Sequence, residues 1–259
     1  MAMKTRRDKC TARPIVYFEE DGRANLPDVI KVIKSTMRKR SDLRTVVFFT
    51  ANGEGPAVAF NQLQDLEPRI IAVTFPLTFF SKRNDEVFRP EIPQKVRNFF
   101  AGVRIPILTG RLPWDHIDGA TAHNNDMDLI QKSLSIVGGS FPLCIQAVLQ
   151  ACDMGAVGQG EIVIGATGDC AAVVRATMSQ HAFSKEQGVA VLEILCKSRN
   201  PTLFYRWASS SAVPSTQTAL ELRPSSHENT TLASSDASNA TLPPSSQFQR
   251  VSREGEQKP

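Results

Sequence analysis

The stretch that decides the fold is Thr45–Leu66, which reads TVVFFTANGEGPAVAFNQLQDL. It begins with an apolar run, continues through a polar turn with two glycines, and ends in a helical pattern. In an α/β domain such a unit places backbone N–H groups and a helix N-terminus at the carboxyl edge of a parallel sheet, where anions and nucleotides bind. A second stretch, Glu161–Met178 (EIVIGATGDCAAVVRATM), repeats the apolar run and the Gly-rich turn. The sequence therefore predicts two loops that meet at one ligand-binding edge.

The composition indicates one sizeable domain followed by a polar tail. The chain has 259 residues, 41% of them hydrophobic, and a formal net charge of +4. The charge suits an anionic small molecule, but the sequence has no basic stripe with interleaved aromatics, so we expect no nucleic-acid partner. From position 208 onward Ser, Thr, Pro and Gln dominate, which predicts disorder. We expect a flexible N-terminus over 1–13, a single domain over 14–206 and a disordered tail over 207–259.

The cysteine spacing and the N-terminal residues indicate the cellular compartment that we expect. Five cysteines, at positions 10, 144, 152, 170 and 196, have no CxxC spacing, which disfavours a disulfide scaffold or a zinc site and favours a reducing compartment. The basic N-terminus lacks an apolar core, so we expect no secretory signal, although a short organellar presequence stays open. No run approaches the roughly 18 apolar residues of a membrane span. We expect a cytoplasmic protein with no metal and no membrane partner.

Apolar runs and helical stripes alternate along the chain. Continuous apolar runs predict buried strands, and apolar residues recurring at intervals of three and four predict helices. The expected strands are 15–18, 46–50, 69–75, 104–109, 161–166 and an antiparallel return strand over 171–178; the expected helices are 26–37, 56–66, 92–103, 127–137, 141–154 and a last one over 184–197, begun by a capping box of Ser184 and Gln187. The alternation indicates an α/β fold: three layers, a mostly parallel sheet flanked by helices, and an antiparallel last strand.

Three further features have a structural explanation that we prefer to a functional one. The loop over 75–89 is rich in phenylalanine, which more often packs a loop onto a core than holds a ligand. The segment over 110–125 carries Trp114, His116 and His123, but two histidines without cysteine or carboxylate partners at ligand spacing do not make a metal site. Asp153 ends a nearly all-apolar helix, and we expect it to be buried and to pair or to accept backbone N–H bonds.

Four stretches in order resemble the C-terminal α/β domain of pyruvate kinase, and more closely its stand-alone relatives in archaea and bacteria. They are Val47–Glu54 (VFFTANGE), Ala151–Gly155 (ACDMG), Glu161–Gly168 (EIVIGATG) and Leu192–Arg199 (LEILCKSR). The match covers about 15–199 and none of the tail. The resemblance implies the pyruvate kinase C-terminal domain-like fold. It also implies that pyruvate kinase activity is absent, because in that enzyme the domain is regulatory and catalysis sits on a separate barrel, for which this chain has no room.

The resemblance also implies a ligand. In some kinases of that family a phosphorylated effector lies between two loops, which correspond to Thr50–Gly55 and Gly165–Asp169 here. Stand-alone members look able to hold a flavin nucleotide, so the implied cofactor is flavin mononucleotide (FMN). The expected ligand- and phosphate-binding residues are Thr50, Asn52, Gly53, Glu54, Gly165, Thr167 and Gly168. Asp169 stands where relatives carry a basic residue, and its charge would repel a phosphate.

We therefore expect a binding or regulatory module for a phosphorylated small molecule or a nucleotide. Two alternatives stay open: a flavin-dependent or phosphometabolite enzyme, and an interaction protein that works through its tail. The sequence has no Ser–His–Asp signature and no paired carboxylates, so we assign no catalytic residue. A homo-oligomer is compatible with these expectations.

Overall fold

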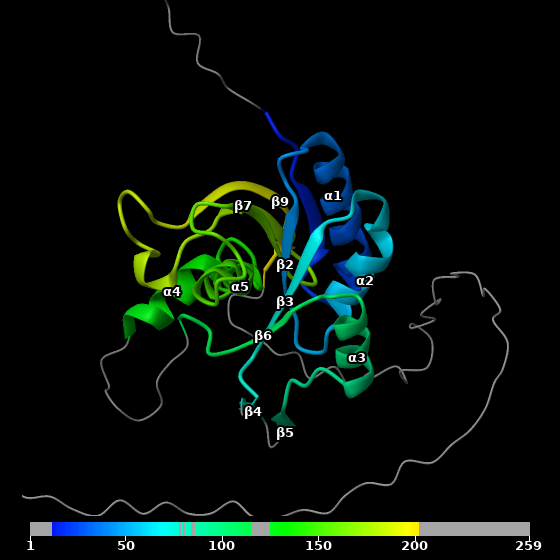
Figure 1. Ribbon diagram of the computed structural model, residues 1–259. Coiled ribbons are helices and arrows are strands. Elements are labelled where there is room, and N and C mark those ends of the chain that lie inside the picture. Colours follow the sequence, from blue (N-terminus) through cyan, green and yellow to red (C-terminus); the bar gives the residue numbers. More distant parts are fainter. Residues whose placement is uncertain (1–11, 78, 80, 84–85, 115–124, 202–259) are drawn as a thin grey trace, which may run out of the picture. The chain divides into compact units, whose positions relative to one another are not determined.

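The computed structural model describes residues 12–77, 79, 81–83, 86–114 and 125–201 (Figure 1). Its strands are β1 (Val16–Glu20), β2 (Thr45–Phe49), β3 (Arg69–Thr74), β4 (Ser81–Arg83), β5 (Glu86–Phe88), β6 (Ile107–Thr109), β7 (Ile162–Ala166), β8 (Ala171–Arg175) and β9 (Ala190–Asn200). Its α-helices are α1 (Leu26–Lys39), α2 (Glu54–Gln62), α3 (Gln94–Gly102), α4 (Asn125–Ser135) and α5 (Phe141–Asp153). Strands and helices therefore alternate, as the sequence predicts for an α/β fold.

A sheet of seven strands forms the centre, in the order β1-β9-β8-β7-β2-β3-β6. The pairs β1–β9, β7–β2, β2–β3 and β3–β6 are parallel, and β8 is antiparallel to both of its neighbours. Strands β2 and β3 lie well inside the sheet and are almost wholly buried, which explains their unbroken apolar sequences. The predicted mostly parallel sheet, flanked by helices, is confirmed.

Helices cover both faces of the sheet and enclose two apolar clusters. Figure 1 shows α1, α2 and α3 on one side and α4 and α5 on the other. Helix α1 buries the stripe that the sequence predicts, including Val29, Ile30 and Ile33, against this first face. Its outer face carries lysines and arginines, and Lys34 and Arg38 pair there with Asp65. The positive residues of α1 are thus a solvated surface with local ion pairs.

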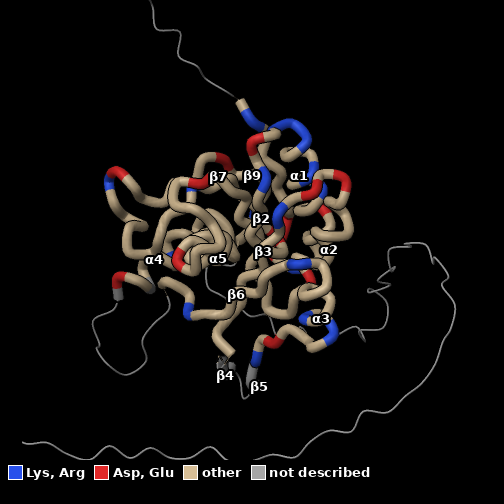
Figure 2. The backbone as a smooth tube through the Cα atoms, in the orientation of Figure 1, with Lys and Arg blue, Asp and Glu red and all other residues tan. Residues whose placement is uncertain are grey.

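Helix α5 is the most buried helix of the described chain. Every residue from Phe141 to Cys152 is buried, as its nearly all-apolar sequence predicts. It approaches strand β7 closely because residue 165 is glycine: a Cβ there would lie 2.8 Å from the carbonyl oxygen of Cys144. In Figure 2 most of α5 is tan, whereas α1 carries blue and red segments and α3 carries blue ones. This helix is the core of the second face.

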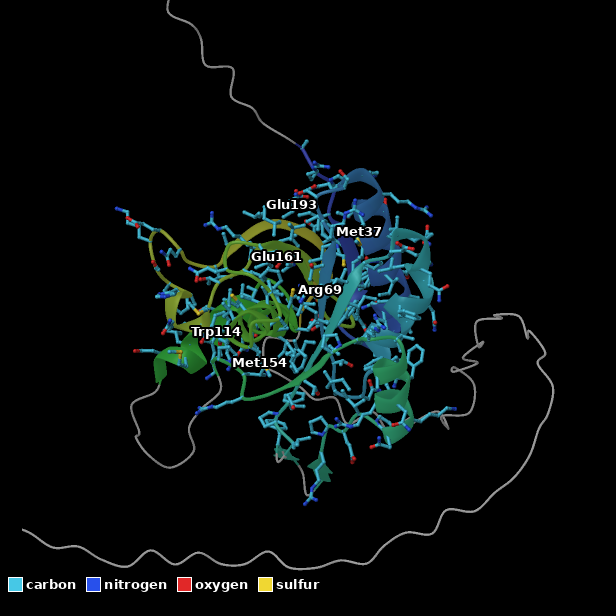
Figure 3. All side chains as sticks on the ribbon, in the orientation of Figure 1. Met37, Arg69, Trp114, Met154, Glu161 and Glu193 are labelled. Carbon is cyan, nitrogen blue, oxygen red and sulfur yellow. The ribbon has the colours of Figure 1, made fainter. Side chains whose placement is uncertain are left out.

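The loop after β6 is fastened to the second face through Trp114, which Figure 3 labels beside α4 and α5. Its backbone N–H donates to Oε1 of Gln146 on α5 at 2.8 Å, and its carbonyl oxygen accepts from the amide of Gln131 on α4. The indole is buried and stacks on Phe183, with ring centroids 6.0 Å apart. Trp114 therefore packs the loop down. His116 and His123 lie outside the described residues, as do positions 1–11 and 202–259, where the flexible N-terminus and tail are expected.

The prediction of a helix over 184–197 is wrong. Residues over 184–197 form a turn and then strand β9, which pairs with β8 on one side and β1 on the other. The capping-box residues make only a local contact, from the Gln187 N–H to Ser184 Oγ at 3.4 Å. The segment forms a strand because pairing with two neighbouring strands and burying Leu195 and Cys196 stabilise it more than the local helical pattern does. The antiparallel strand is consequently β8, the last but one, rather than the last.

Two smaller expectations also need correction. The loop over 75–89 contains a short antiparallel hairpin, β4–β5. Asp153 is exposed rather than buried, and its Oδ1 accepts the backbone N–H of Ser179 at 2.7 Å. Its role is the structural one that the sequence favours. In the described part of the chain, no helix combines the length and the apolar character needed to cross a bilayer.

Candidate ligand-binding edge of the sheet

The two predicted loops lie next to each other at the carboxyl edge. Strands β2 and β7 are parallel neighbours, with Val47 opposite Gly165 and Phe48 opposite Ala166. The β2–α2 loop and the β7–β8 turn therefore leave the sheet side by side. The loop after β1 leaves from the same edge, because β1 is parallel to β9 and β9 is antiparallel to β8. Three loops, from β1, β2 and β7, converge here.

In the β2–α2 loop, Thr50 and Asn52 cap the start of α2. Thr50 is buried, and its Oγ1 accepts the backbone N–H of Gly53 at 2.9 Å. The Oδ1 of Asn52 accepts the N–H of Glu54 at 3.1 Å. Both side-chain oxygens satisfy N–H groups that a helix start leaves without intrahelical partners. Asn52 is exposed, and its amide nitrogen can donate to a ligand.

Two of the predicted site glycines are required by packing. Gly53 has φ +85°, and a Cβ there would lie 2.7 Å from Cγ1 of Val96 on α3. Gly165, as described above, allows α5 to approach β7. Both glycines were expected among the ligand-binding residues, but in the structure a helix occupies the space beside each of them. By contrast, a Cβ at Gly168 would meet only an ordinary contact, 3.6 Å from Cα of Arg23.

Asp169 is the centre of a buried polar network. Its Oδ2 accepts the Gly22 N–H at 2.9 Å, and its Oδ1 accepts hydroxyl hydrogen bonds from Thr167, at 3.0 Å, and from Ser140 at the N-terminus of α5. Burial raises the pKa of Asp169, although the hydrogen bonds from Ser140 and Gly22 oppose the rise. The carboxylate thus joins the β1–α1 loop, the β7–β8 turn and α5. The expectation that it faces a phosphate is corrected, because it is buried and engaged by these donors.

Arg23 is the basic residue nearest to these two loops among those described, and no motif in the sequence points to it. It follows β1, lies against Gly168, and its Nε forms an ion pair with the carboxylate of Glu54. Its side chain is 68% exposed, against 28% for Glu54. Arg23 therefore links the β2–α2 loop to the β7–β8 turn from a third segment. Its place at this edge could not be predicted, because the position of β1 in the sheet depends on its pairing with β9. The sequence pattern predicts a helix where β9 lies.

The thiols near this edge serve packing. Cys144, Cys170 and Cys196 are buried. The neighbouring Cys144 thiol and burial raise the pKa of Cys170 well above its ordinary value, and burial raises that of Cys196 to about 12. Since the thiolate is the nucleophilic form, the thiols of Cys170 and Cys196 are unreactive at neutral pH.

The edge offers binding groups of known chemistry: the guanidinium of Arg23, the amide of Asn52 and the backbone around Gly168. Among the residues that the structure describes, no group of three or more His, Cys, Asp or Glu side chains is arranged to hold a metal ion. The chain matches no protein-family model and no curated protein. The case for function therefore rests on the geometry of this edge.

Proposed function

We propose that the chain is a binding or regulatory module for a phosphate-bearing small molecule or nucleotide, held at the carboxyl edge between the β2–α2 loop and the β7–β8 turn. The observation that carries this proposal is Arg23, which lies against Gly168 and pairs with Glu54. A guanidinium presents a planar set of donors that suits phosphate oxygens. An exposed ion pair contributes little free energy, so a phosphate can compete with Glu54 for this arginine.

The surrounding backbone supports the same location. Helices α1 and α2 begin after the short loops that follow β1 and β2. Ser140 at the start of α5 touches Thr167 of the β7–β8 turn, with 2.6 Å between their hydroxyl oxygens. Helix N-termini carry a partial positive charge, which favours anions. Parallel sheets commonly bind ligands outside the carboxyl ends of their strands. These features favour an anion near Asn52 and Gly168.

Membership of the pyruvate kinase C-terminal domain-like family is part of this proposal. The supporting points are the four resembling stretches, the parallel pair β2–β7 and the antiparallel β8 beside it. FMN is the nucleotide that the resemblance favours. We propose no phosphoryl transfer from phosphoenolpyruvate to ADP, since in the enzyme that the chain resembles this chemistry belongs to a separate catalytic barrel.

Isothermal titration of the full chain with FMN and with glucose 6-phosphate tests the proposal. We expect at least one to bind, and Arg23→Ala to weaken its binding about tenfold, the effect of losing one charge-assisted hydrogen bond. Arg38→Ala is the matched control, because Arg38 is an exposed arginine in an ion pair with Asp65, at the other end of α1. A phosphoenolpyruvate-to-ADP assay of the same sample should show no turnover.

Two results would overturn the proposal. The first is the absence of binding of either ligand to the unaltered chain at millimolar concentration. The second is an equal loss of affinity in Arg23→Ala and Arg38→Ala, which would indicate non-specific attraction to positive charge. Native mass spectrometry of the purified chain adds an independent check, because a retained flavin or phosphate ester appears directly as added mass.

A further inference from the structure

A cavity of about 400 Å³ lies further along the same edge, beyond the loops described above. It is formed by the carboxyl ends of β3 and β6 and by the segment that leads into α3. Thr74 and Thr109, which pair in register across these two strands, line it. Its volume is at the small end of the roughly 300–1,000 Å³ typical of small-molecule sites. It shares no lining residue with the site around Arg23 and Gly168.

The charged lining of this cavity has a positive surplus. Arg89 and Arg97 contribute guanidinium groups, and Glu91 contributes one carboxylate. Neither arginine forms an ion pair with any residue that the structure describes. Arg97 is half-buried in the first turn of α3, and its Nε donates to the carbonyl oxygen of Ile92 at 3.0 Å. This bond fixes the guanidinium while its two terminal nitrogens stay available to an acid group.

The opposite wall is apolar and aromatic. Phe75 and Phe79 line the cavity and stack on each other, with ring centroids 4.4 Å apart and planes at 24°. Phe75 is buried and also meets Phe49 edge-on at 4.8 Å, so the aromatic wall is anchored to the core of the second face. Ile92, on the other side, is buried. A ligand here would meet a fixed aromatic surface next to positive charge.

We infer that this cavity is a second binding site, separate from the one proposed above, and that it takes a small organic acid. The acid group, a carboxylate or a phosphate, binds Arg97 with help from Arg89 and the Thr109 hydroxyl. The apolar body of the ligand packs against Phe75 and Phe79. Charge and shape act together: the arginines select an anion, and the aromatic wall selects one with a flat apolar part over a fully hydroxylated sugar acid.

Ligand-observed NMR titration of the full chain tests this inference with three probes: benzoate, phenyl phosphate and the neutral benzyl alcohol. We expect both acids to bind, and benzyl alcohol to bind about tenfold more weakly or not at all. Arg97→Ala should weaken acid binding about tenfold, and Thr109→Val should weaken it a fewfold. Arg69→Ala is the matched control: it removes an exposed arginine at the amino end of β3, the same strand that ends at the cavity (Figure 3).

The outcomes separate the two sites. If Arg23→Ala lowers benzoate affinity and Arg97→Ala does not, the acid binds at the first site and the second site is rejected. If benzyl alcohol binds as tightly as benzoate, or Arg69→Ala weakens acids as much as Arg97→Ala, the inference is also rejected. Circular dichroism checks that Arg97→Ala is folded; if it is not, Thr109→Val, a change of one hydroxyl to a methyl, decides the question by the same criterion.

Discussion

Two parts of one sheet edge differ in how their polar groups are used. In the loops after β2 and β7, Thr50, Asn52 and Asp169 already bond to neighbouring backbone or hydroxyl groups. In the cavity after β3 and β6, Arg97 makes one fixing bond and keeps its remaining donors. The polar groups of a Gly-rich turn can thus be used in hydrogen bonds within the protein. Polar groups left open beside a cavity are the better indicator of a ligand.

The largest expected effect tests whether the glycines of the first part serve packing. Gly53→Ala should destabilise the chain by about 2–4 kcal/mol, because it combines a left-handed backbone conformation with a Cβ 2.7 Å from Val96. Urea unfolding followed by circular dichroism measures it. Gly155→Ala is the control: Gly155 also has positive φ, +68°, but nothing lies within 4 Å of its Cβ position, so the cost should be about 1 kcal/mol. Equal costs would show that the contact with α3 is unimportant.

A smaller effect concerns the buried network. Asp169→Ala should destabilise the chain by about 2 kcal/mol, because the partly buried Gly22 N–H and the hydroxyls of Ser140 and Thr167 lose their acceptor. Urea unfolding at neutral pH measures it. Asn52→Ala is a suitable comparison, since it removes an exposed acceptor from the neighbouring turn.

The pH dependence of that cost gives a separate test. Burial raises the pKa of Asp169 above the ordinary 3.8, so the folded chain holds this proton over an interval where the unfolded chain has released it. The contribution of Asp169 to stability is therefore greatest below pH 3.8 and falls as the pH rises through its folded-state pKa. The difference between the unaltered chain and Asp169→Ala should shrink with rising pH. A difference that grows would mean that the hydrogen bonds outweigh burial and lower the pKa.

The smallest effect concerns the competition for Arg23. Glu54→Gln removes the carboxylate that pairs with this arginine, so a phosphate ligand should bind about two- to fivefold more tightly. The change should leave stability nearly unaltered, because Arg23 is exposed and Glu54 is only partly buried. Calorimetric titration at low and moderate salt measures it. Unchanged affinity would indicate that the ligand does not use Arg23.

Much of the sheet could be predicted from sequence. Strands β2, β3 and β7 are buried on both faces, so their apolar runs are unbroken, and α1 and α5 have clear apolar patterns. Strand β9 could not be recognised, because its residues satisfy a helical pattern locally and become a strand only through β1 and β8. The turn preceding it is closed by Gly188, where a Cβ would lie 2.4 Å from the carbonyl oxygen of Ser184. The need for glycine at position 188 comes from the backbone geometry of the turn, which a capping-box pattern does not indicate.

The sequence predicted which loops lie together at the sheet edge, but not which other residues lie beside them. That Thr50 and Thr167 follow neighbouring parallel strands was inferable from two similar stretches of sequence. The contribution of Arg23 required the position of β1, and the role of Gly53 required the position of α3. Arg97 and Thr109 lie in segments with no motif. They come together because strands β3 and β6 pair and α3 begins beside their ends.

The pairing of β1 with β9 has a consequence for synthesis of the chain. Glu19 and Arg199 are 180 positions apart, yet they lie on adjacent parallel strands. During translation β1 emerges early and has no strand to join until β9 has left the ribosome, whereas β2, β3, β6, β7 and β8 can already assemble. The closing of the sheet is therefore a late event. Until then Gly22, Arg23 and their loop are not held at the carboxyl edge, so a nascent chain assembles the proposed site only when β9 is in place.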